Sequence, residues 1–175
     1  MACLLTSGRA LGCKTSTGGL KAVYFADYGT LGTTTIVDGE ITAITGTPVF
    51  FKFDLKGSST LEQTITSSRE NGSTFTTQAL NLTLPILDKA TQEQIKLLSV
   101  ARPHVVVEDY NANFILLGKD NGTEVVSGTI VSGANMGDMS GFTLSMEAME
   151  SDPAFFVTST VVTANESATQ IDPNA

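Results

Sequence analysis

Apolar and polar residues alternate over several short stretches of this chain. Between residues 49 and 55, Phe51, Phe53 and Leu55 alternate with two charged residues. Side chains two positions apart lie on the same face of a strand. The pattern therefore predicts a half-buried strand from Val49 to Leu55, with the three apolar side chains on one face.

Similar patterns predict further strands along the chain. These cover residues 20–26, 36–41, 104–107, 114–117, 123–130, 142–148 and 155–157. Asp38-Gly39 falls inside the second segment, and Asp-Gly readily takes the positive φ of tight hairpin turns. We expect that segment to be a tight hairpin, and residues 155–157 to form a short edge strand.

A long hairpin is predicted from Ser58 to Leu84, because Asn71-Gly72 is a strong hairpin signal. At its base, Leu80, Leu82 and Leu84 alternate with polar residues, whereas the segments near the turn are polar on both faces. A hairpin tip without apolar residues projects into solvent or onto a partner. The residues expected to form an assembly interface at this tip are Glu70, Asn71, Gly72 and Ser73.

One helix is predicted from Asp88 to Val100. Leu87, Ile95 and Leu98 lie near one stripe, and Pro103 follows the end. The sum of these elements indicates a mainly β fold, an antiparallel β-sandwich or barrel with one flanking α-helix and a long projecting hairpin. We expect an N-terminal arm over residues 1–19, a core domain over 20–157, and a polar C-terminal extension over 158–175 that a neighbouring copy would hold.

Composition narrows the class of protein. Charged residues make up 16% of the chain, the formal net charge is -8, and Lys and Arg form no run. Such a surface repels phosphate backbones rather than gripping them. The apolar run at the N-terminus is too short for a signal peptide, and no segment has the ~18 apolar residues of a membrane helix. We expect a protein made in a cytoplasm, with no membrane association and with Cys3 and Cys13 reduced.

Candidate chemistry is sparse. The chain has a single histidine, His104, and no G-x-S-x-G motif or cluster with metal-ligand spacing. Glu108 with Asp109, and Glu147 with Glu150, are the notable carboxylate pairs, and the first pair is expected to be solvated. A Ser-His-Asp triad, whose members meet only in space, and a calcium ion at an Asp/Asn turn stay open. We expect no enzyme, no cofactor and no metal.

The order of these elements resembles the tail tube proteins of tailed bacteriophages, a fold shared with the tube protein of type VI secretion. The resemblance covers residues 20–157 and is carried mainly by three stretches, which are similar to tail proteins of phages that infect Bacteroidetes-type hosts. They are Val-Glu-Asp-Tyr-Asn-Ala-Asn-Phe-Ile-Leu-Leu-Gly at 107–118, Gly-Asp-Met-Ser-Gly-Phe-Thr-Leu at 137–144, and Glu147 with Ser-Asp-Pro-Ala at 151–154.

The resemblance implies a virion structural protein of the tail, assembled in the host cytoplasm. Copies would form hexameric rings that stack into a tube, contact other tail proteins, and let genomic DNA pass without specific binding. The lumen would then be poor in Lys and Arg, and its candidate residues are Glu108, Asp109, Glu124 and Glu147. Three alternatives are another tail or connector protein, a carbohydrate-binding β-sandwich, which the absence of Trp disfavours, and a hydrolase on a β-scaffold.

Overall fold

The computed structural model describes residue 5 and residues 7–173 and has a mainly β fold. The strands are β1 (Leu20–Ala26), β2 (Thr34–Val37), β3 (Glu40–Ile44), β4 (Phe51–Asp54), β5 (Thr60–Ser68), β6 (Ser73–Pro85), β7 (His104–Asp109), β8 (Phe114–Leu117), β9 (Glu124–Val131), β10 (Gly141–Glu150) and β11 (Phe155–Val157). The helices are α1 (Lys89–Leu98) and α2 (Ser159–Thr163).

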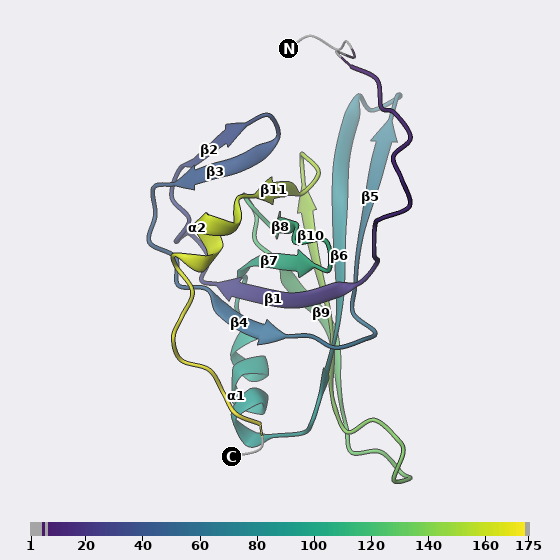
Figure 1. Cartoon of the computed structure of the whole chain (residues 1–175), viewed down its shortest axis with the longest axis vertical. Coiled ribbons are helices and arrows are strands. Elements are labelled where there is room, and N and C mark those ends of the chain that lie inside the picture. The colour runs from purple at the N-terminus through teal and green to yellow at the C-terminus, as the bar shows by residue number, and fades with distance from the viewer. Residues whose placement is uncertain (1–4, 6, 174–175) are drawn as a thin grey trace.

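The strands form two sheets that pack as a sandwich (Figure 1). The larger sheet has the order β2-β3-β11-β8-β7-β1-β4, and the four-stranded sheet has the order β5-β6-β10-β9. Every pairing is antiparallel except the parallel pair β3 and β11. The predicted sandwich with a flanking helix is confirmed, and neither sheet closes into a barrel.

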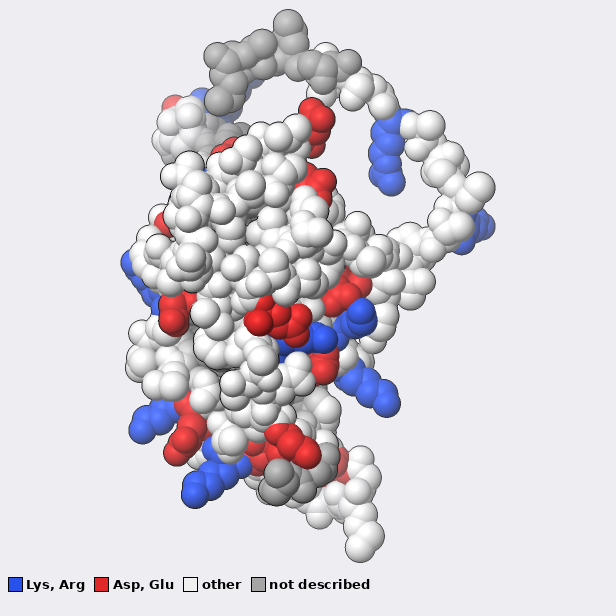
Figure 2. Space-filling view, turned by 60° about the vertical axis from the view of Figure 1, so that its left-hand side comes forward, with Lys and Arg blue, Asp and Glu red and all other residues white. Residues whose placement is uncertain are grey.

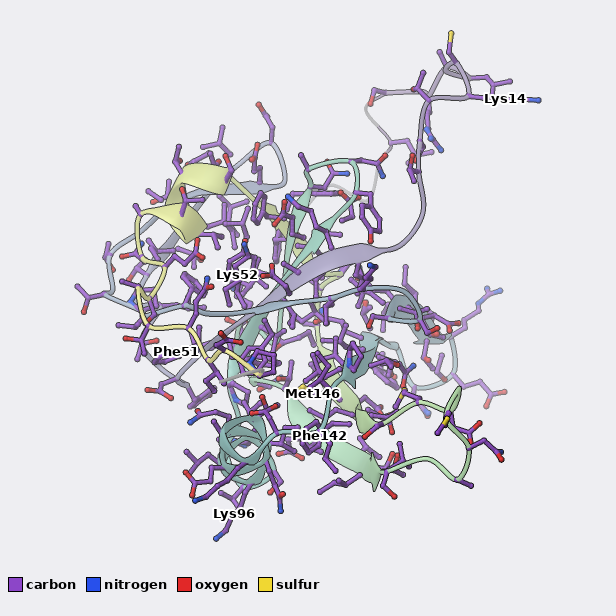
Figure 3. All side chains as sticks on the ribbon, turned by 60° about the horizontal axis from the view of Figure 1, so that its bottom comes forward. Lys14, Phe51, Lys52, Lys96, Phe142 and Met146 are labelled. Atoms are coloured by element: carbon purple, nitrogen blue, oxygen red, sulfur yellow. The ribbon has the colours of Figure 1, made fainter. Side chains whose placement is uncertain are left out.

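The main core lies between the sheets. Val23 and Phe25 of β1, with Val105 and Val107 of β7, face a layer of leucines on β6 and apolar residues on β10. Phe142 and Met146 of β10 lie in this layer (Figure 3). The alternate residues of β1 and β7 are buried too, in a second cluster on the opposite face of the larger sheet. These central strands therefore have both faces buried, which explains their nearly unbroken apolar sequence.

Helix α1 covers one end of the sandwich, as predicted (Figure 1). Its N-cap is Asp88, whose Oδ2 accepts a 2.7 Å hydrogen bond from the backbone N–H of Thr91. Ile95 and Leu98 pack against the main core from the exposed helix.

The C-terminal extension is held largely by its own domain. Helix α2 places Val162 fully in the second core cluster, and the backbone near Glu166 pairs with Phe50. The expectation that a neighbouring copy holds this segment is wrong for residues 158–167, because a short apolar run within a polar tail provides the anchor.

Strand β4 also differs from expectation. Leu55 is buried, but Phe51 is 42% exposed, and Phe50 is the phenylalanine buried in the second cluster. The strand covers Phe51–Asp54, whereas the sequence predicted a strand from Val49 to Leu55.

The N-terminal arm stands away from the body over residues 7–16 (Figure 2). It joins the domain at Thr17, whose backbone N–H and carbonyl bind the side chain of Asn111 at 2.9 and 2.8 Å. Cys13 is exposed on this arm, and Cys3 lies outside the described residues.

Candidate assembly surface

The outer face of the four-stranded sheet is covered by small polar side chains, and we call it the polar face. Its residues alternate along each strand with those that face the larger sheet. They are Thr60, Glu62, Thr64, Thr66, Phe75, Thr77, Ala79, Asn81, Thr83, Glu124, Ser127, Thr129, Thr143, Ser145, Glu147 and Met149. The four strands, all of whose residues are described, contain no Lys or Arg.

Hydrogen bonds between neighbouring strands link side chains of this sheet. The Ser145 hydroxyl donates to Asn81 Oδ1 at 2.6 Å, and the Thr129 and Thr143 hydroxyls bond to each other. The polar face is therefore a hydroxyl-rich surface on which some side chains hydrogen-bond to one another.

Acidic side chains form a row across the polar face. The register places Glu62 of β5 opposite Ala79 of β6, Ala79 opposite Glu147 of β10, and Glu147 opposite Glu124 of β9. The four strands carry no cation, and among the described residues the row has one ion pair, between Glu124 and Arg102 at 3.9 Å, so the row gives this face a negative potential.

Both edges of the four-stranded sheet are open. Within the described part of the chain, β5 pairs with β6 alone and β9 with β10 alone. Each edge carries exposed apolar side chains, with Ile65 of β5 at 63% and Val126 and Ile130 of β9 at 64% and 54% exposure. Such long unpaired edges readily accept a strand from another chain.

The predicted hairpin tip is present and fully exposed. Strands β5 and β6 pair as far as Ser68 and Ser73, and the turn between them contains Glu70, Asn71 and Gly72. The Asn71 N–H donates to Ser68 Oγ at 3.3 Å, and Gly72 supplies the positive φ of 62°. The four predicted interface residues therefore lie together at one end of the molecule (Figure 1).

Two of the four lumen candidates lie on the polar face and two do not. Glu124 and Glu147 share it, as described. Glu108 is on β7 and is 6% exposed, so the expectation that it is solvated is wrong. Its carboxylate accepts a 2.5 Å hydrogen bond from Lys21 Nζ and a 3.0 Å one from the Tyr24 hydroxyl. Burial and the Glu108 carboxylate raise the pKa of Tyr24. The hydrogen bond between Lys21 and Glu108 raises the pKa of Lys21.

Asp109 is also remote from the polar face. Its Oδ1 accepts the backbone N–H groups of Asn111 and Asn113, each at 2.8 Å, which fixes the turn between β7 and β8. Partial burial opposes ionisation, but these hydrogen bonds outweigh it and lower the pKa of Asp109. The carboxylate therefore acts as a turn anchor.

The other carboxylates and the histidine are likewise bound by backbone groups. Glu150 lies on the opposite face of β10 from Glu147, and its Oε1 accepts the N–H groups of Asp120 and Asn121. His104 accepts the Gly29 N–H at Nε2 (3.0 Å), so Nδ1–H donates to the Gly118 carbonyl (2.7 Å). Among the described residues, no three His, Cys, Asp or Glu side chains gather as metal ligands.

Comparison with known proteins adds no further assignment. No family model, curated protein or solved structure matches this chain. None of the helices in the described part of the chain is long and apolar enough to cross a membrane.

Sequence reasoning missed Glu62 and the exposed apolar residues at the sheet edges. Glu62 follows Leu61, which packs against the core, so period-two alternation marks it as outward-facing. Its alignment with Glu147 depends on pairing between distant strands, which no local pattern specifies.

Proposed function

We propose that this protein is a self-assembling subunit of a phage tail tube, whose rings stack into a conduit for the genome. The observation that carries the proposal is the four-stranded sheet with two open edges and a polar outer face, whose strands carry no Lys or Arg. The sequence resemblance to tail tube proteins supplies the class of assembly.

The direction of the edge strands favours ring closure. Each neighbouring pair in the order β5-β6-β10-β9 is antiparallel, so β5 and β9 run in opposite directions. The β9 edge of one copy can therefore pair antiparallel with the β5 edge of the next, which is a head-to-tail contact that closes into a ring. Pairing would also cover Ile65, Val126 and Ile130.

In such a ring, one face of the four-stranded sheet must point toward the lumen. The larger sheet packs against the inner face of the four-stranded sheet, so it would lie on the outside of the ring, and the polar face would line the lumen. Six four-stranded sheets give a barrel well above the about 16 strands at which β-barrels leave an aqueous channel. A wall whose strands carry no Lys or Arg lets a polyanion pass, because each phosphate neutralised by a cation would add affinity.

Negative-stain electron microscopy of the purified protein, with light scattering, tests the proposal. We expect rings or tubes from the native chain. Ile65→Lys and Val126→Lys, which place charge at the two edges, should each abolish them, while the matched control Leu97→Lys on α1 should not. A native chain that stays monomeric at high concentration, even on a tail template, would overturn the proposal.

A further inference from the structure

A groove of about 390 Å³ lies between strand β4, the segment that leads into α1, and the C-terminal segment. Phe51, Ile86 and Ile171 line it, and all three remain more than a third exposed. In Figure 3 the Phe51 side chain lies beside the C-terminal segment. Exposed aromatic and aliphatic side chains from three separate segments make this an unfilled apolar surface.

The groove is also acidic. Asp54 and Asp88 line it together with one cation, Lys52, which already pairs with Asp54 at 3.3 Å. Asp88 uses Oδ2 to cap helix α1, whereas its buried Oδ1 has no hydrogen-bond partner among the described residues. The negative charge of the Asp88 carboxylate favours an occupant with positive charge.

Ile86 adds a third feature. Its φ is 72°, a left-handed conformation that is strained for a β-branched residue. Its N–H donates to the Ser140 carbonyl at 2.8 Å, which holds the conformation. The fold thus retains a strained, solvent-exposed isoleucine at the rim of the groove, as is common where backbone strain serves binding.

The N-terminal arm has the complementary properties. Leu5 and Leu11 are fully exposed on it. Residues 1–19 contain Arg9 and Lys14 and no acidic residue, a charge of +2, so residues 20–175 carry -8 - 2 = -10. A basic arm with free leucines matches an acidic apolar groove in both charge and polarity.

The arm and the groove lie at opposite ends of the molecule. In Figure 1 the arm rises past the tip of β5 and β6, whereas α1 and the C-terminal segment lie at the other end, and Figure 3 shows Lys14 far from Phe51. Residues 5–18, if extended, reach about 46 Å, which exceeds the ~30 Å diameter of a small domain. The arm can therefore span to a neighbouring copy.

We infer that the arm of one copy binds in the groove of a second copy, with Leu11 against Ile86 and Phe51 and the basic residues near Asp88. This inference deepens the proposed function and rests on it, since the contact would join copies along the stacking direction. Gly12 precedes the Thr17 clamp, so the arm can bend there while the clamp stays in place.

A labelled synthetic peptide of residues 1–18, with both cysteines replaced by serine, tests the contact by fluorescence anisotropy against the full chain. We expect saturable binding that weakens at least tenfold for Ile86→Asn, and for a peptide with Leu11→Asn. Asn tolerates positive φ, so the first variant should fold. The matched control Val100→Asn, an exposed aliphatic outside the groove, should change affinity less than twofold.

Crosslinking identifies which copy supplies the arm. A photoreactive residue at position 11 of the full chain, in a mixture of ¹⁵N-labelled and unlabelled protein, should give mixed-isotope crosslinks to residues 84–94 or 169–173. No peptide binding, equal binding to Ile86→Asn, or crosslinks within one chain alone would overturn the inference.

The test of the arm contact and the test of tube formation can give different results. Normal tubes from a Leu11→Asn chain would overturn the arm contact and leave the tube standing. Groove-dependent peptide binding with intermolecular crosslinks, in a protein that never forms rings, would support the arm contact and overturn the tube.

Discussion

Glu124 and Glu147 occupy directly opposite positions on β9 and β10, and both point outward from the four-stranded sheet. Like charges in directly opposed positions destabilise a sheet. The strands of this sheet carry no cation, and Arg102, which lies outside the sheet, approaches Glu124 at 3.9 Å between Nη1 and Oε1. This exposed ion pair offsets the repulsion only in part. The two glutamates therefore lower the stability of the isolated subunit, which is understandable if their charge serves the assembled state.

Removing one of these charges should stabilise the monomer. We expect Glu147→Gln to raise the free energy of unfolding by about 0.2–1 kcal/mol, measured by urea denaturation at low salt. Glu62→Gln is the matched control, because Glu62 faces Ala79 across the strands and should give a smaller gain. The difference should shrink at high salt, which screens exposed charges. A loss of stability on Glu147→Gln would contradict the repulsion.

Shortening the β5–β6 hairpin should separate folding from assembly. Thr66 pairs with Phe75, so replacing residues 67–74 with an Asn-Gly turn joins two positions already opposed. The apolar residues of β6 lie beyond this point, so we expect a folded chain with unchanged circular dichroism and no tubes by electron microscopy. Normal tubes from this variant would show that the tip makes no essential contact.

Reversing charge on the polar face should make assembled tubes retain DNA. We expect Glu62→Lys with Glu147→Lys to give salt-dependent binding of duplex DNA, because each phosphate contact releases counterions. Asp27→Lys with Glu93→Lys makes the same change in net charge at exposed positions off this face and should bind much less. The measurement is a filter-binding titration on tubes at two salt concentrations. Equal binding by both variants would argue against a lumen lined by the polar face.

Stability should fall as the pH drops below about 6.5, the ordinary histidine pKa. Burial disfavours the charged ring and lowers the pKa of His104, against the opposing influence of the Gly118 carbonyl. The unfolded chain then takes up a proton first, so each pH unit between the unfolded and folded pKa values costs at most about 1.4 kcal/mol.

The single histidine makes this readily measurable. Urea denaturation should show the loss between pH 7 and 5.5, with a flatter profile for His104→Gln. NMR titration of the ring protons reports the folded pKa directly, and a value above 6.5 would contradict the prediction.

Local patterns were sufficient for most of the fold. The strand at Leu20–Ala26 has the predicted bounds, and the Asp38-Gly39 turn and the long hairpin lie where their turn residues indicate. The carboxylates were harder to place. Glu108 follows three buried valines and looked like a strand end facing solvent, yet Lys21 and Tyr24, from a strand more than eighty residues earlier, cover and bind it. Partners so distant in sequence leave no local trace.

Strand β11 has a consequence for the order of folding. It lies between β3 and β8, so the expectation that residues 155–157 form an edge strand is wrong, and the β2–β3 hairpin joins the larger sheet through them. During synthesis, therefore, the β2–β3 hairpin has no route into the finished sheet until residues 155–157 have left the ribosome. Non-local pairing of this kind is slow. A chain truncated before β11 would therefore leave the β2–β3 hairpin detached from the larger sheet.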